Sequence, residues 1–320
     1  MKTPLAFFIL AAAMLPSIAS AKPLRALIID GQNNHSVWPK STIMMRQYLE
    51  ETGLFKVDVA RTRFVWRSER EADWLPLAGV AEGIPTKTPQ TDPNFKPDFS
   101  KYDVVISNFG CKAAAWPKET EAALETYMRD GGGFVSVHAA DNCFPDWKAY
   151  NQMIGIGGWD GRTEEHGPYV YVNKLGEVVR DDAPGICGKH GPKADLVVTM
   201  RERAHPICQG LPERWLHAYD ECYAYMRGPA EDLTILGTAI SSLTQRNEPM
   251  LMTIEYHKGR VFHTTLGHDA KAFECVGFIT TFKRGVEWAA TNKVTMSEVP
   301  KDFPGGDTVS FRPFERKQGR

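Results

Sequence analysis

Polar side chains that can bind metals or move protons stand directly after several stretches with the pattern of buried strands. They are Asp30 with His35, Asn108, His138 with Asp141, and His268 with Asp269. His166 and the pair Asp220–Glu221 lie in loops that can cover the same edge of a sheet. A single histidine after a strand is most often structural, whereas several at predictable strand ends favour a functional site.

Imidazole and carboxylate groups together permit two kinds of chemistry. They can hold a divalent metal such as zinc, manganese, iron or nickel, which polarises a carbonyl or activates water. They can also act without a metal as general acid and base, since an unperturbed histidine titrates near pH ~6.5. The chain contains neither HExxH nor HxH, so local spacing does not decide between these two uses.

Nucleophilic catalysis is disfavoured by the residue at the sharp turn after the strand predicted at 134–137. A nucleophile elbow has a small residue two positions before and two positions after the nucleophile. Here Ser136 and Ala140 take the small positions, and His138 takes the place of the nucleophile. A cysteine hydrolase that uses Cys143 or Cys111 is therefore only a third hypothesis.

Alternating strands and helices must position these side chains. Strands are predicted at 24–30, 55–60, 102–108 and 134–137, and helices at 39–51 and from 117 to the glycines at 131–133. The strand–helix–strand order at the start predicts a doubly wound, mostly parallel α/β sheet. Ligands bind at the carboxyl ends of strands in such sheets, which places His138 at the ligand-binding edge.

The second half of the chain is rich in β-pattern. Strands are predicted at 169–172, 194–200, 233–238, 250–256 and 260–265, with a closing helix from about 271 to 290. The last two strands are joined by the turn 257–259 and predict a β-hairpin addition. Residues 64–100 lack periodicity and predict an insertion or flap. Residues 296–320 predict a C-terminal tail after a domain spanning 22–295.

Three further histidines carry structural expectations. His217 and His190 are expected in loops, with His217 facing solvent. His263 lies inside a predicted strand and is expected to pack against a neighbour.

The N-terminal residues and the charge bound the location and the partners of the protein. Residues 1–21 combine Lys2, an apolar run and small residues before the cleavage point, which predicts a secretory signal and a periplasmic or secreted protein. The 38 Lys and Arg residues nearly balance 39 Asp and Glu residues without a basic block. This balance argues against nucleic acid or an anionic membrane as partner once the signal is cleaved.

Cysteine use and assembly are left open by the sequence. The chain has six cysteines and no CxxC pair, so neither a zinc ribbon nor a thioredoxin motif is present. One to three disulfides, or several free buried thiols, are both compatible with an exported protein. The sequence is also compatible with either a monomer or a homo-oligomer.

Several short motifs together resemble the ThuA-like (trehalose-utilisation) family. They are Gly132–Ala140, Ala204–Ile207 with Gly210–Pro212, Asp220–Tyr223, Gly259–His268 and the closing helix Phe278–Ala290. The resemblance covers most of residues 24–295 and implies a flavodoxin-like fold similar to class I glutamine amidotransferases. It also implies that the amidotransferase cysteine is absent, in agreement with His138 at the elbow. Family members are tied to sugar catabolism through 3-keto glycosides.

Our leading hypothesis is therefore a periplasmic enzyme that acts on a glycoside or 3-keto glycoside by hydrolysis, elimination or isomerisation, with a small carbohydrate as ligand. The catalytic residues would be His138, His268 and Glu221, and the substrate would be oriented by Asp30, Asn108, Asp220 and Tyr223. A divalent metal, if it takes part, would be held by His138, His166 and His268. The second hypothesis is a non-catalytic carbohydrate- or partner-binding protein on the same fold.

Overall fold

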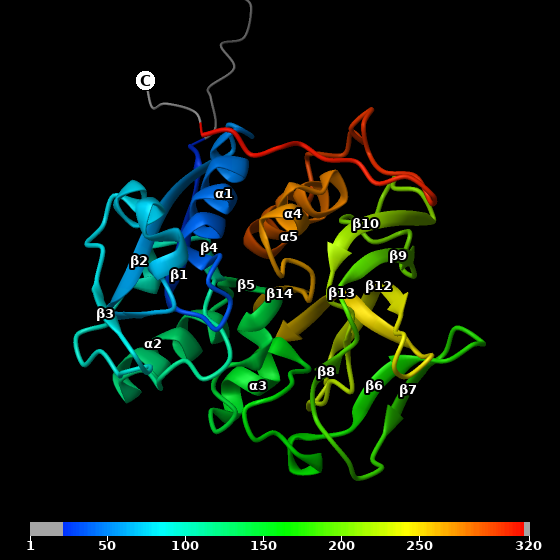
Figure 1. The fold of residues 1–320 in the computed structure, drawn as a ribbon, viewed down its shortest axis with the longest axis horizontal. Helices are drawn as coiled ribbons and strands as arrows, with labels where there is room; N and C mark the ends of the chain where they lie inside the picture. The colour runs from blue at the N-terminus through cyan, green and yellow to red at the C-terminus, as the bar shows by residue number, and fades with distance from the viewer. Residues whose placement is uncertain (1–21, 317–320) are drawn as a thin grey trace, which may run out of the picture.

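The computed structural model describes residues 22–316, and half of its main sheet is parallel (Figure 1). The parallel strands are β1 (Leu24–Gln32), β2 (Phe55–Trp66), β3 (Ile84–Thr86), β4 (Val104–Ser107), β5 (Gly133–Val137) and β14 (Gly259–Thr264). They lie in the order β3-β2-β1-β4-β5-β14. The expected doubly wound, flavodoxin-like α/β fold is confirmed.

The other half of the sheet is antiparallel and continues from β14. Its strands are β13 (Asn247–Tyr256), β12 (Leu233–Ile240), β9 (Ala194–Met200) and β10 (Arg214–Asp220), with β6 (Tyr169–Val172) and β7 (Val178–Asp181) attached to β13. The predicted hairpin is confirmed as β13–β14. Because β14 also pairs in parallel with β5, this hairpin joins the two halves. A small second sheet pairs β8 (Lys189–His190) with β11 (Tyr223–Ala224).

Helices cover both faces of the parallel half. α1 (Trp38–Glu50), α4 (Ala270–Glu274) and α5 (Val276–Thr291) pack on one face, and α2 (Lys118–Arg129) and α3 (Lys148–Ile154) pack on the other (Figure 1). Strand β1 supplies both cores, since Ala26 and Ile28 face one side and Leu27 and Ile29 face the other. Burying each of the Leu and Ile side chains stabilises the fold by about 1.5–3 kcal/mol.

The closing helix predicted at 271–290 is interrupted. Cys275 has extended backbone angles, φ −62° and ψ 127°, and separates α4 from α5. The Asp269 side chain caps α4 by accepting from the backbone N–H groups of Lys271 and Ala272. The short helix therefore begins at Ala270, and its N-cap, Asp269, directly follows His268.

Residues 64–100 do not form a loose flap. They begin with the end of β2 and continue through the 3₁₀ helix η1 (Glu69–Ala78), β3 and the 3₁₀ turn η2 (Phe99–Lys101). Leu75, Phe95 and Phe99 are buried, and the backbone oxygen of Leu75 accepts a hydrogen bond from Arg61 at 2.9 Å. Apolar side chains without helical or strand periodicity are what pack this segment onto the sheet.

The C-terminal segment is also packed rather than free. It crosses the face that carries α1, α4 and α5 (red in Figure 1), and Phe303, Phe311 and Phe314 contact the core there. The Leu216 and Val276 amides donate to backbone oxygens of this segment at 2.8 and 2.9 Å. Residues 296–316 therefore belong to the folded domain instead of forming the predicted tail.

The predicted export signal, 1–21, lies outside the described residues. None of the helices in residues 22–316 is long and apolar enough to cross a membrane. All six cysteines are free thiols and five of them are buried. This agrees with the alternative of several free buried thiols rather than with disulfides.

Candidate functional site

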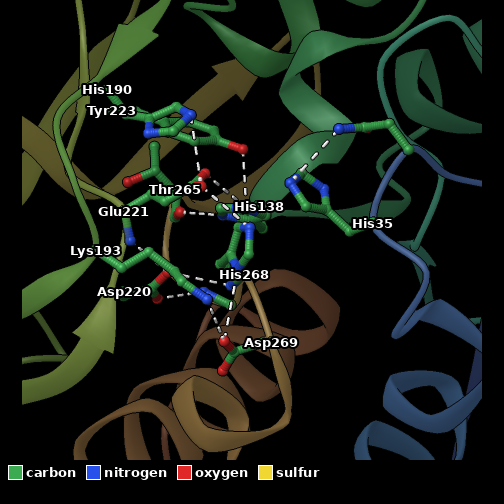
Figure 2. A network of polar contacts seen from close by, with 12 residues as sticks. His35, His138, His190, Lys193, Asp220, Glu221, Tyr223, Thr265, His268 and Asp269 are labelled. Atoms are coloured by element: carbon green, nitrogen blue, oxygen red, sulfur yellow. Dashed lines mark hydrogen bonds and ion pairs between the residues drawn. The ribbon is translucent and has the colours of Figure 1, made fainter.

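Four histidines converge on Glu221 at the carboxyl edge of the parallel strands (Figure 2). His35 follows β1, His138 follows β5, His268 follows β14, and His190 comes from β8. Glu221 itself follows β10, so the antiparallel half of the sheet supplies the carboxylate. We call these five residues the open cluster. They lie at the edge where ligands bind in this type of sheet.

Glu221 occupies the centre of the open cluster. Its Oε1 atom lies 3.0 Å from His268 Nε2 and 3.4 Å from His190 Nε2, and its Oε2 atom lies 3.9 Å from His138 Nε2. Burial alone would raise the pKa of Glu221. The hydrogen bond from His268 and the surrounding imidazoles outweigh burial and lower that pKa, so the carboxylate stays ionised.

His138 is buried and its tautomer is fixed by two contacts. Nδ1 lies 2.6 Å from the backbone oxygen of Thr265, which can only accept, so Nδ1 carries the proton. Nε2 therefore accepts from the Tyr223 hydroxyl at 2.8 Å. Burial lowers the pKa of His138. Its φ of +47° is left-handed, a strained conformation that is concentrated at functional sites.

His268 lies at the border of a cavity and is partly exposed. Burial lowers its pKa, but the neighbouring Asp269 and Glu221 carboxylates outweigh that effect and raise the pKa to about 9. The imidazole rings of His138 and His268 are 5.6 Å apart. The open cluster thus holds one histidine biased toward the neutral form next to another biased toward the charged form.

His35 completes the open cluster from the first loop of the chain. Its ring centre is 4.7 Å from those of His138 and His268. Burial and the neighbouring histidines hold its pKa well below the usual range. Its Nδ1 atom is buried and has no hydrogen-bond partner within residues 22–316. The position of His35 after the first strand was its only signal in the sequence.

Asp220 stabilises the open cluster through buried hydrogen bonds. It is fully buried and pairs with His217 at 2.8 Å, and it accepts from the backbone amides of Glu221, Gly267 and His268 at 2.8, 2.7 and 3.1 Å. Asp220 therefore positions Glu221 and His268, two of the three residues that we expected to be catalytic. The expectation that His217 faces solvent is wrong, because it lies inside β10 with no exposed surface.

Asp30 and Asn108 lie at the expected edge of the sheet, but their side chains form hydrogen bonds within the protein interior. Asp30 accepts from Arg61 through both carboxylate oxygens, at 2.8 Å each, and from Thr42 at 2.8 Å. The Asn108 amide donates to the backbone oxygen of Trp38 at 3.1 Å and to Thr42 at 2.9 Å. Both side chains are buried, and their contacts fix α1 against the sheet rather than reach a ligand.

Two predicted site residues, Tyr223 and His166, lie in different parts of the structure. Tyr223 is buried, donates to His138 and packs its ring 4.6 Å from that of Trp159, so it supports the open cluster. His166 lies in the 3₁₀ turn η4 (Glu164–His166), where its Nδ1 accepts from the Thr163 amide at 3.1 Å. Among residues 22–316, the group of side chains close enough to share a metal contains His35, His138 and Glu221. Of the three predicted ligands, it includes His138 but neither His166 nor His268.

Two histidines outside the predicted site have clear positions. His190 reaches Glu221 because β8 pairs with β11, a contact between distant segments that has no local sequence signal. Nε2 of His263 pairs with Asp141 at 3.0 Å and Nδ1 contacts the backbone oxygen of Ile154 at 2.8 Å, as expected for a histidine packed inside a strand. Asp141 belongs to η3 (His138–Asn142), the turn that carries His138.

Cys143 and Cys111, the two candidates for a thiol mechanism, give it no support. Cys143 is fully buried and burial raises its pKa, while burial raises the pKa of Cys111 to about 11. A thiolate is the reactive form of cysteine, and both environments disfavour it.

A cavity of about 560 Å³ opens beside the open cluster. His35 and His268 lie in its wall, together with Asn34, Arg67, Arg70 and Lys193. A larger cavity of about 660 Å³ is lined by Asp103, Gly131 and Gly132, at the opposite edge of the sheet and away from the histidines. The polar wall of the first cavity offers hydrogen-bond donors to a hydroxyl-rich ligand.

Comparisons with known structures agree with this architecture. The structure is similar to that of a protein designated ThuA-like from Parabacteroides merdae, with a TM-score of 0.80 and 39% identity, over 91% of this chain and 98% of that chain. A second protein with this designation, from Bacteroides uniformis, has a TM-score of 0.52 and 15% identity, over 88% and 98% of the two chains. The second likeness shows the fold alone.

The family comparison covers most of the chain. A search of curated proteins finds no match. The family model named ThuA and described as trehalose utilisation matches residues 25–289, which confirms the resemblance drawn from the motifs and gives the chain a sugar-related role. The chain belongs to the ThuA (trehalose utilisation) family.

Proposed function

We propose that this chain is an enzyme that converts a glycoside or a 3-keto glycoside by hydrolysis, elimination or isomerisation. The observation that carries the proposal is the open cluster: four imidazoles surround one ionised carboxylate beside a polar cavity of about 560 Å³. The family's description as trehalose utilisation supports a sugar as the ligand.

A ketone in the sugar ring makes this chemistry accessible to imidazoles and carboxylates. A C–H bond next to the carbonyl is acidified, so a base can take its proton. In an elimination, the electron pair of that C–H bond forms a carbon–carbon double bond while the glycosidic C–O bond breaks. The departing oxygen then takes a proton from an acid. The site must carry a transferable proton and stabilise negative charge on the carbonyl oxygen.

In this proposal, the His268–Glu221 pair exchanges protons with the substrate. Its two partners are 3.0 Å apart, and the side chain of His268 is 20% exposed in the cavity wall. His138 and Tyr223 lie deeper and can approach only the reacting end of a bound sugar. Arg67 and Lys193, in the same wall, can donate hydrogen bonds to hydroxyl groups further from the reacting carbon.

The test is turnover of trehalose and its 3-keto form by the purified protein, followed by mass spectrometry. His268→Gln is compared with His257→Gln, since His257 lies exposed on the β13–β14 turn. We expect conversion by the wild type and by His257→Gln, and a loss of about 10²- to 10⁴-fold in His268→Gln. Binding without turnover, seen as a shift in melting temperature alone, would favour a carbohydrate-binding protein and contradict the proposal.

A further inference from the structure

We propose that His35, His138 and Glu221 form a binding site for one divalent transition-metal ion with open coordination positions. One candidate ligand atom from each of the three residues lies within 4.8 Å of the other two. Metal–nitrogen distances of about 2.0–2.1 Å place the ligand atoms of a tetrahedral ion about 3.3 Å apart. Small side-chain movements would therefore close this group around a metal.

The two histidines have nitrogens available for such an ion. Nδ1 of His138 donates to the backbone oxygen of Thr265, which leaves the lone pair on Nε2. A metal-binding histidine usually has this second hydrogen bond, because it fixes the tautomer and the ring orientation. The lone pair on Nε2 accepts from the Tyr223 hydroxyl at 2.8 Å, so the ion would take the place of that hydrogen bond. Nδ1 of His35 is buried without a hydrogen-bond partner among the described residues, and its Nε2 has only a 3.5 Å contact with the Asn34 amide.

The two carboxylate oxygens of Glu221 have different roles in the proposed metal site. Oε1 receives both His268 and His190. Oε2 is the oxygen that faces His138, at 3.9 Å. His268 and His190 thus act as outer partners that orient the carboxylate, an arrangement common around metal sites. His268 therefore supports the ligand set here rather than forming part of it.

The donor set indicates the class of metal. Two imidazoles and one carboxylate suit zinc, iron(II), cobalt, nickel or manganese, whereas calcium and magnesium prefer all-oxygen sites. Structural zinc sites use four protein ligands, while sites with three leave a position for water or substrate. The strained backbone of His138 and the adjoining cavity are also typical of a reactive site.

The role of the metal rests on the proposed function, but its binding does not. A Lewis acid in this position would polarise a sugar carbonyl and stabilise the negative charge that forms when the adjacent C–H bond loses its proton. His268, in the cavity wall, is left free to exchange a proton with the substrate.

The experiment measures metal binding to the whole purified protein after treatment with a chelator. Cobalt(II) and zinc are titrated by calorimetry, and the bound metal is counted by elemental analysis. The variants are His35→Gln and Glu221→Gln, which remove a ligand at nearly constant size, with His166→Gln and His257→Gln as matched controls. Far-UV circular dichroism checks that each variant is folded.

We expect one ion per wild-type chain and per control chain, and a loss of affinity of about 100-fold or more in both ligand variants. A wild type that binds no stoichiometric metal, or ligand variants that bind as tightly as the controls, would overturn the metal site. The two proposals fail separately. Metal binding without sugar conversion contradicts only the function, and conversion by the fully stripped chain contradicts only the catalytic role of the metal.

Discussion

Histidine and carboxylate side chains meet in two different ways in this molecule. In the closed pairs, His217–Asp220 and His263–Asp141, all four side chains are fully buried, and the paired atoms lie 2.8 and 3.0 Å apart. In the open cluster, one carboxylate serves several imidazoles, and a polar cavity adjoins them.

The difference separates residues that hold the site from residues that act in it. Asp220 binds the backbone amides of Glu221 and His268, and Asp141 belongs to the turn that begins with His138. The closed pairs therefore hold in place the loops that carry residues of the open cluster. A histidine with a carboxylate partner is evidence of function here only when it also has free donor or acceptor capacity and access to a ligand.

The largest expected effect comes from changing the centre of the open cluster. Glu221→Gln removes the charge that orients His190 and His268 while it keeps the size of the side chain. We expect a loss of turnover of about 10²- to 10⁴-fold, with the fold retained, because the two closed pairs remain. The measurement is the rate of conversion of a 3-keto glycoside, together with a melting curve. A variant with near wild-type turnover would show that Glu221 is not part of the reacting site.

Breaking a closed pair should instead reduce stability. His217→Ala leaves the Asp220 carboxylate buried without its imidazole, which costs about 3–5 kcal/mol of unfolding free energy. Urea unfolding measures this loss. Turnover per folded molecule should fall much less than in Glu221→Gln, since Asp220 still binds the backbone amides of the loop. Unchanged stability would contradict the structural role of the pair.

A buried acid without an imidazole provides the third test. Glu248 is 2% exposed, and burial, despite a hydrogen bond from Thr244, raises its pKa to about 7. The folded state therefore binds a proton more tightly than the unfolded state, so this group destabilises the fold as pH rises from about 4.5 to 7. Glu248→Gln should gain stability relative to the wild type over that window, by roughly 1.4 kcal/mol per pH unit at most.

The stability difference should then be constant above pH ~7, because Glu248 is ionised in both states there. Thermal or urea unfolding of both proteins across the pH range would check the slope. A difference that shrinks as pH rises would show that the carboxylate is stabilised when buried, contrary to the expected direction.

The smallest effect is expected at the histidine that the sequence placed in the metal site and the structure places outside it. His166→Ala removes an acceptor for the Thr163 amide at one end of a single 3₁₀ turn. We expect a loss of about 1 kcal/mol or less in unfolding free energy and unchanged turnover. A marked loss of activity would bring His166 back to the site and weaken the ligand set proposed here.

The parallel half and its functional edge were predictable because the relevant patterns are local. Short apolar strands alternate with amphipathic helices, and His138 and His268 directly follow strands that lie side by side as β5 and β14. Asp30 and Asn108 followed the same rule, yet their side chains bond to Arg61 and to α1. A position after a strand predicts the edge but not whether the side chain points toward a ligand.

The rest of the site depends on contacts between distant segments. His190 reaches Glu221 only because β8 pairs with β11, and His217 is buried because β10 lies under α4 and α5. The packing of 296–316 likewise rests on a few aromatic side chains rather than on a periodic pattern. No local signal in the sequence reports these tertiary contacts.

The most direct test of the account is NMR of the imidazole groups in the ¹⁵N-histidine-labelled chain during titration with 3-keto-trehalose. The chain has nine histidines, and each can be assigned by substitution. We predict that the signals of His35, His138 and His268 shift with the sugar, while those of His217 and His263 stay unchanged. Shifts confined to the closed pairs, or to histidines away from Glu221, would contradict the assignment of the open cluster as the functional site.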